Sequence, residues 1–290
     1  MNIFKKSYYA VKRPLKLVRW DMRRQAVARQ YGADTLAGMP VVLGNAIPKA
    51  GSHLLIQILL GLPKIGPFVN PGFPPVNRDE ANNKLSVDRI VKNIERMQGG
   101  DVGYAYLNCE PPWDELLTRP NMAAVFIYRD PRDVVVSEIK YATNIYTKHD
   151  LHVYFNETLK TDEERLNLVI RGSTMPGLTY TGVKERFTNY SGWLDSSVLC
   201  LRFEDLVLRH EPAYYDLLDY LAKYGFTPSM SREEAIQTLM DNIAPKKSGT
   251  FRKGKPGGWK DVFTEENKAL FKEEAGEILI RYGYEKDLDW

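Results

Sequence analysis

The chain has 290 residues, 43% of them hydrophobic, and this length and composition predict one main domain with a substantial buried core. The formal net charge is +3, and the two cysteines, Cys109 and Cys200, belong to no CxxC motif or Cys/His cluster. This pattern excludes a disulfide framework and a zinc site, and it favours a reducing, cytoplasmic location. No apolar run approaches the roughly 18 residues that a membrane span requires.

The first residues of the chain, 1–30, form a basic segment with nine Lys/Arg and one acid, Asp21. Apolar residues recur along it at spacings of three and four, which predicts an amphipathic helix. Such a helix either lies on a membrane surface or docks on the rest of the protein, and we favour docking. We therefore expect a helical, basic N-terminal arm over residues 1–38 and one domain over residues 39–290.

Three short apolar runs rich in Val and Phe predict β-strands, and a helical pattern follows each of them. The strands are expected at residues 39–43, 123–128 and 198–203, and the helices at 52–62, 131–142 and about 212–224. Alternation of strands and helices implies crossover connections. We therefore predict an α/β fold: a single P-loop-like, three-layer domain with a central, mostly parallel sheet flanked by helices. Ligands of such sheets bind at the carboxyl ends of the strands.

Other parts of the chain have weaker patterns. Residues 61–77 contain five prolines and predict a long irregular loop. Apolar spacing between residues 265 and 282 predicts a helix with one buried face. Residues 143–182 are polar and aromatic, and they favour no particular element.

The stretch "NAIPKAGSHLL" (45–55) connects the first predicted strand to its helix. Free N–H groups and the dipole at a helix start favour an anion, and Gly51 lets the backbone approach it closely. Lys49 adds a positive charge, and Ser52 is expected to cap the helix. The order differs from a Walker A loop, in which the lysine follows the glycine. A phosphate or sulfate site is our interpretation; the alternative is a simple turn with one exposed lysine.

The stretch "YRDPRDVVVS" (128–137) follows the second predicted strand. Asp130 suits the N-cap and Pro131 suits the first helical position. Arg129 is thus expected at the strand end, with Ser137 about two turns into the helix. Together they are suited to bind a second phosphate. The alternative is that they are a surface arginine and an ordinary helix serine with no ligand.

The stretch "PKKSGTFRKGKPGGWK" (245–260) holds six Lys/Arg, four glycines and no acid. Its cations attract a polyanion, and its glycines allow the backbone to adapt to one. Nucleic acid is the competing ligand. Because Phe251 and Trp259 are the only aromatic residues of this stretch, we favour a small polyanion and expect no nucleic-acid partner.

These stretches, in this order, resemble the cytosolic type of sulfotransferases that depend on 3′-phosphoadenosine 5′-phosphosulfate (PAPS). "IPKAGSHLL" is similar to the family's 5′-phosphosulfate loop, "YRDPRDVVVS" to its 3′-phosphate motif, and "FRKGKPGGWK" to its C-terminal RKGxxGxWK motif. "LRFEDL" (201–206) resembles a further stretch next to the adenine site. The resemblance, over residues 39–288, implies in-line transfer of a sulfuryl group from PAPS to a hydroxyl or amine of a small molecule. The product PAP is released, and no metal is required.

The resemblance also implies roles for single residues. The 5′-phosphosulfate would be held by Lys49 and the amides of Ala50, Gly51, Ser52, His53 and Leu54, and the 3′-phosphate by Arg129, Ser137, Arg252, Lys253 and Gly254. Leu54 replaces a tryptophan that stacks on adenine in many members, so adenine is expected to pack on Phe203, Phe251 or Trp259. Lys49 would also be catalytic, because it neutralises charge on the leaving phosphate.

The chain departs from the family where a histidine base is usual. In "GYAYLNCEPPW" (103–113) there is no histidine, and Tyr106 or Asn108 falls nearest. His53 stands at the start of the predicted helix, where the dipole lowers its pKa and favours the neutral form. It is either the catalytic base or a ligand of the sulfuryl group. Tyr106 and Glu110 are the other candidates for the base.

Two other functions remain open from the sequence: a PAP-binding or PAPS-binding protein without turnover, and a nucleotide-dependent kinase of related fold. A kinase needs the Walker A order and metal-binding carboxylates, and the sequence offers neither clearly. A hydrophobic or phenolic acceptor is expected, with residues 61–77 and 141–155 as walls of its pocket. The sequence leaves the oligomeric state open.

Overall fold

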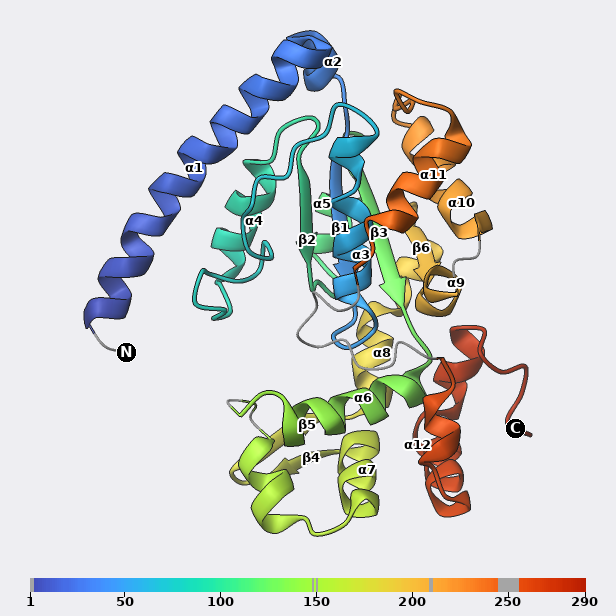
Figure 1. Cartoon of the computed structure of the whole chain (residues 1–290). Helices are drawn as coiled ribbons and strands as arrows, with labels where there is room; N and C mark the ends of the chain where they lie inside the picture. The colour runs from blue at the N-terminus through green and yellow to red at the C-terminus, as the bar shows by residue number, and fades with distance from the viewer. Residues whose placement is uncertain (1–2, 148, 150, 209–210, 245–255) are drawn as a thin grey trace.

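The computed structural model describes residues 3–147, 149, 151–208, 211–244 and 256–290 (Figure 1). At its centre is a four-stranded sheet in which every strand pair is parallel. The strands lie in the order β2-β1-β3-β6. Their bounds are β1 Val41–Ala46, β2 Val102–Ala105, β3 Met122–Tyr128 and β6 Leu199–Arg202. The predicted α/β fold with a central parallel sheet is confirmed.

Helices contribute to the hydrophobic cores on both faces of this sheet. On one face they are α4 Val87–Glu95, α5 Trp113–Leu117, α6 Pro131–Asn144, α7 Asp162–Arg171, α8 Val183–Ser191 and α12 Glu265–Arg281. On the other they are α3 Ser52–Leu59, α9 Phe203–Val207, α10 Glu211–Ala222 and α11 Arg232–Asp241. A separate antiparallel hairpin consists of β4 Gly172–Met175 and β5 Leu178–Thr181.

The central strand β3 explains the three layers. Successive side chains of a strand point to opposite faces, so Ala124 and Phe126 join the core that contains α6. Ala123, Val125 and Ile127 join the core that contains α3. All seven residues of β3 are buried, as expected for a parallel strand covered on both faces.

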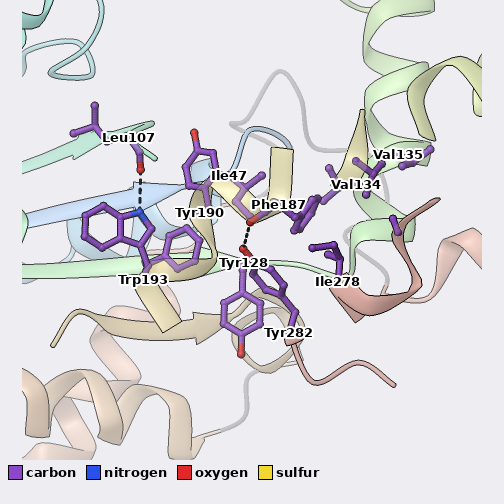
Figure 2. Close-up of a cluster of buried hydrophobic side chains, with 14 of the residues drawn as sticks. Ile47, Leu107, Tyr128, Val134, Val135, Phe187, Tyr190, Trp193, Ile278 and Tyr282 are labelled. Atoms are coloured by element: carbon purple, nitrogen blue, oxygen red, sulfur yellow. Dashed lines mark hydrogen bonds between the residues drawn. The ribbon is translucent and has the colours of Figure 1, made fainter. Parts of the chain in front are cut away.

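Aromatic side chains in the core on the α6 face fix the segment that follows β2 (Figure 2). The indole Nε1 of Trp193 donates a hydrogen bond to the carbonyl of Leu107 (3.0 Å). The buried amide of Asn45, at the end of β1, donates to the same carbonyl (2.8 Å) and accepts from the Leu107 N–H (2.9 Å). Tyr106 is therefore held beside the carboxyl end of the neighbouring strand.

The N-terminal helix α1 (Ile3–Tyr31) packs against the sheet domain and is followed by α2 (Ala33–Ala37). Buried Trp20 donates to the Asp101 carboxylate (2.8 Å), which also pairs with Arg24 (2.9 Å). The opposite side of α1 exposes three apolar side chains, Leu15, Val18 and Met22. No helix in the described part of the chain has the length and apolar character needed to cross a membrane.

Several predicted bounds differ from the structure. The first strand begins at Val41 instead of residue 39 and continues to Ala46, and α3 ends at Leu59, followed by a 3-10 turn. The segment 143–182, which had no prediction, contains α7 and the β4–β5 hairpin. The short strand β2 was not predicted, because Gly103 interrupts its apolar pattern.

Candidate functional site

A tight turn joins β1 to α3 at the carboxyl edge of the sheet. Within it, Lys49 and Gly51 have positive φ angles of 71° and 102°. A Cβ at Gly51 would lie 2.3 Å from Cδ2 of Phe203, so the turn backbone packs directly on that ring and only glycine fits. Gly51 is the N-cap of α3. The prediction that Ser52 caps the helix is therefore wrong: Ser52 is its first residue.

Some backbone N–H groups of this turn already donate to protein carbonyls, and others are available to bind a ligand. The Ala50 N–H donates to the Ile47 carbonyl (3.0 Å), and the Leu54 N–H donates to the Gly51 carbonyl (2.9 Å). Ser52 and His53 are the first residues of α3, so their N–H groups have no acceptor within the helix. Of the amides predicted to hold the anion, those of Ser52 and His53 are thus better placed than those of Ala50 and Leu54.

Lys49 points its ammonium group at the face of Tyr141, on α6, with 3.4 Å between Nζ and the ring centroid. Burial lowers the pKa of Lys49 to about 8; the positive charge of Arg129 acts in the same direction, and the Glu138 carboxylate opposes it. The turn lysine and the arginine at the end of β3 are therefore close enough to influence each other. A second negative group between them would relieve that repulsion.

Arg129 directly follows β3, as predicted. Its guanidinium pairs with Asp133 (3.1 Å) and lies over the Phe203 ring, 4.5 Å from the centroid. Its Nε is buried and has no hydrogen-bond partner in the described structure. Ser137 lies one turn beyond Asp133 on α6, so the two residues share a helix face.

The predicted N-cap, Asp130, accepts a hydrogen bond from the Arg132 N–H, and Pro131 occupies the first helical position. Asp133 anchors the end of the basic C-terminal stretch, because its two carboxylate oxygens accept from the N–H groups of Gly257 and Trp259 (2.9 Å each). This stretch therefore ends beside the Arg129–Asp133 pair. The predicted ligand residues within it lie outside the described residues: Phe251, Arg252, Lys253 and Gly254.

Trp259, one of the residues expected to pack on adenine, is buried. The guanidinium of Arg132 lies over its ring, 4.0 Å from the centroid, and Trp290 packs against it edge-on. Phe203, in contrast, lies between the turn at Gly51 and the guanidinium of Arg129. Of these two, Phe203 is the one beside the candidate anion site.

The three candidate bases occupy different surroundings. His53 is exposed at the start of α3, and partial desolvation together with the Lys49 charge lowers its pKa. Tyr106 donates its hydroxyl hydrogen to Oγ of buried Ser52 (3.0 Å). Glu110 is exposed just before α5, and its backbone carbonyl accepts from the Trp113 N–H (2.8 Å). The structure thus brings His53 and Tyr106 to the turn, while Glu110 lies at the start of another helix.

A polar network around the buried Glu138 side chain has no counterpart in the sequence analysis. The Glu138 carboxylate accepts from His149 Nε2 (3.0 Å) and from the Tyr180 hydroxyl (3.1 Å), and the Tyr180 hydroxyl in turn accepts from Arg186. Burial opposes ionisation of Glu138, yet the His149 hydrogen bond and the Arg186 charge hold its pKa below the ordinary value. Only the position of Glu138 directly after Ser137 could have drawn attention to it.

The tautomer of His149 follows from its contacts. Its Nδ1 accepts from the Leu151 N–H (3.1 Å), so Nε2 carries the hydrogen that is donated to Glu138. Both ring nitrogens are occupied. His149 is therefore a structural partner of Glu138 and has no lone pair available to act as a base.

A cavity of about 220 Å³ lies between α1, α3, β2 and the segment 70–80. Two of its lining residues are close in sequence to the Ser52–Tyr106 pair: Ile56 lies one helical turn after Ser52, and Tyr104 lies two residues before Tyr106. Part of the proline-rich loop, residues 70–76, lines it, whereas residues 141–155 do not. Among the described residues no group of three or more His, Cys, Asp or Glu is arranged to hold a metal ion.

Comparisons with known proteins bear on the family and the fold. The family model described as "Sulfotransferase domain" matches residues 42–282. Among solved structures, mouse sulfotransferase SULT7A1 complexed with PAP is similar with a TM-score of 0.59 and 15% identity, over 87% of this chain and 91% of that one. Retinol dehydratase in complex with androsterone and PAP is similar with a TM-score of 0.54 and 17% identity, over 84% of this chain and 83% of that one. At these identities the likeness shows the fold alone. No curated protein matches the sequence.

Proposed function

Because the chain belongs to the sulfotransferase domain family, we propose that it transfers a sulfuryl group from PAPS to a hydroxyl or amine of a small-molecule acceptor. The main support for this proposal is that two features suited to bind anions lie at the same edge of the sheet. One is the turn at Lys49 and Gly51, whose backbone packs on Phe203. The other is Arg129, whose buried Nε has no partner in the described structure.

These residues fit a nucleotide with phosphate groups at two positions. The N–H groups at the start of α3 and the Lys49 ammonium suit the 5′-phosphosulfate, because a helix N-terminus favours a negative charge. Arg129 and Ser137 suit the 3′-phosphate, with the basic stretch that ends at Gly257 as a further source of cations. Phe203 lies between the two positions, where it packs on the turn and under the Arg129 guanidinium. The solved structures of two similar folds contain PAP.

When bound, PAPS would supply the sulfuryl group and the leaving phosphate. The task of the protein in such a displacement is positioning and charge stabilisation. Lys49 would stabilise the negative charge that develops on the leaving phosphate, and Glu138 keeps this lysine protonated by raising its pKa against the effect of burial. Tyr141 would hold the ammonium beside the start of α3.

The acceptor must lose a proton, and we assign this step to His53. Its lowered pKa leaves it neutral at pH 7, so that its ring has a lone pair to accept a proton. Tyr106 already donates its hydrogen to Ser52, which suits it to orient that hydroxyl. Glu110 lies at the start of α5 and is the weakest candidate of the three.

The division of the chain and its location are also proposals. We propose an arm over residues 1–38 and a sulfotransferase domain over residues 39–290. A cytoplasmic location is supported by Cys109 and Cys200, which are both free thiols. The exposed apolar stripe of α1 lies in a segment rich in Lys and Arg, and this combination supports a peripheral contact of residues 1–30 with an anionic membrane.

The proposal is tested by incubating the protein with 35S-labelled PAPS and a panel of phenols, alcohols, sugars and amines. We expect label in at least one acceptor together with release of PAP, and loss of this transfer in Lys49→Ala. Tight binding of PAP without transfer to any acceptor would favour a binding protein without turnover. Absence of both binding and transfer would overturn the proposal.

A further inference from the structure

The cavity beside α3 has an apolar body. Residues from α3, β2 and the end of α4 contribute aliphatic side chains, and the segment 70–76 contributes prolines and Phe73. The apolar lining residues from the helices and the strand are Ile56, Leu59, Leu60, Met97 and Val102. Such a wall fits an apolar ligand, because removal of hydrocarbon from water stabilises the complex.

Three arginines line the same cavity: Arg13 of α1, Arg78, and Arg96 after α4. Glu80 is the one acidic residue in the described lining, and it pairs with Lys16 (3.7 Å). None of the three arginines makes an ion pair with a carboxylate in the described part of the chain. The cavity therefore combines an apolar wall with an excess of positive charge.

The contacts of these arginines leave donors available. Arg13 donates to the side-chain oxygen of Asn93 (2.8 Å), and Arg96 lies over the ring of Phe73, 4.5 Å from its centroid. Burial lowers the pKa of Arg96 and the charge of Arg13 acts in the same direction, whereas the Glu80 and Asp101 carboxylates oppose this shift. Each guanidinium has five N–H donors, and a carboxylate can accept two of them in parallel.

Arg96 lies at the end of the cavity away from the transfer turn, whereas Arg78 follows Asn77, whose side chain donates to the Tyr106 carbonyl (2.9 Å). Ile56 and Tyr104 form the end nearest the Ser52–Tyr106 pair, whereas Arg96 follows the C-terminus of α4, before β2 begins. Eight residues of α3 rise about 12 Å. A molecule of that length, bound along α3, would place one end near Ser52 and the other near Arg96.

We propose that this cavity binds the acceptor, and that the acceptor is an amphipathic molecule with a hydroxyl at one end and an anionic group, such as a carboxylate, at the other. The inference rests on the proposed function for the identity of the bound molecule as the acceptor. Arg13 and Arg96 hold the anionic group, and the apolar wall holds the chain between the two ends. Because Arg13 belongs to α1, the N-terminal helix forms part of the acceptor site.

The first experiment measures binding without turnover. Decanoate is titrated into the full chain by calorimetry, for the wild type, Arg13→Gln, Arg96→Gln and the control Arg89→Gln, whose side chain is exposed on α4 and does not line the cavity. We expect the dissociation constant to rise at least tenfold in the first two variants and less than twofold in the control. Unfolding midpoints check that each variant is folded. No decanoate binding to the wild type, or equal losses in all three variants, would overturn the inference.

The second experiment tests the role of the cavity in transfer. With PAPS as donor, kcat/KM is measured for 10-hydroxydecanoate and for 1-decanol, which has the same chain without the carboxylate. The wild type should prefer the hydroxy acid at least tenfold, and Arg96→Gln should reduce this preference by the same factor. An unchanged preference would overturn the assignment of the cavity to the acceptor. Decanoate binding with no transfer to any acceptor would instead refute the proposed function, and with it the acceptor role of the cavity.

Discussion

Gly51→Ala gives the most specific structural prediction for the candidate site. The residue has φ of 102°, a region in which an L-residue costs roughly 1–2 kcal/mol. The added Cβ would also lie 2.3 Å from Cδ2 of Phe203, whose ring is covered on another side by Arg129. Relief of that overlap requires movement of a buried ring or of the turn, which costs about 1–3 kcal/mol.

A matched control separates the two contributions. Gly177 also has a positive φ, 81°, but a Cβ there would meet no atom within 4 Å. Gly177→Ala should therefore lower the free energy of unfolding only by the cost of a positive φ for alanine, about 1–2 kcal/mol. Gly51→Ala should lose about 1–3 kcal/mol more in the free energy of unfolding, and it should weaken PAP binding at least tenfold because the amides of the turn move.

Urea unfolding measures both stabilities, and calorimetry measures PAP affinity. The double variant Gly51→Ala/Phe203→Ala adds a check, because removal of the ring removes the overlap. Its loss of stability should be smaller than the sum of the two single losses. Equal losses for Gly51→Ala and Gly177→Ala, with PAP affinity intact, would refute the close packing of the turn on Phe203.

Other predictions address charge and proton transfer. PAP affinity should fall as the pH rises from 7 to 10, because Lys49 loses its charge through a pKa of about 8, and Lys49→Arg should flatten that calorimetric profile. His53→Gln should lower kcat about 100-fold or more in the 35S assay with little change in PAP affinity; equal losses in both would indicate a ligand instead of a base. Glu138→Ala should lower the urea-unfolding free energy by about 1–3 kcal/mol, because it leaves the His149 and Tyr180 donors without their acceptor; an unchanged free energy of unfolding would contradict this.

The sequence predicted those parts of the site that depend on local order. Lys49 and Arg129 each follow an apolar strand, and parallel strands bring their carboxyl ends to one edge of the sheet, so both positions could be inferred without coordinates. The N-cap at Asp130 and the helix after it follow from local preferences as well.

Features that depend on distant residues could not be predicted. Glu138 meets Tyr180, 42 residues away, and no local pattern encodes that contact. The cavity arginines come from three separate parts of the chain, Arg13, Arg78 and Arg96, and the docking of α1 brings Arg13 to the other two. The helix cap shifted from Ser52 to Gly51 because the packing of Phe203 requires a residue without a side chain at that point.

The central claim is that the turn at Lys49 and the arginine at the end of β3 bind one molecule of PAP between them. Calorimetric titration of PAP into the wild type, Lys49→Ala and Arg129→Ala tests it most directly, because it needs no acceptor and no turnover. The account predicts that each substitution raises the dissociation constant at least tenfold while the unfolding midpoint shows that the variants remain folded. Unchanged PAP affinity in both variants would contradict the site.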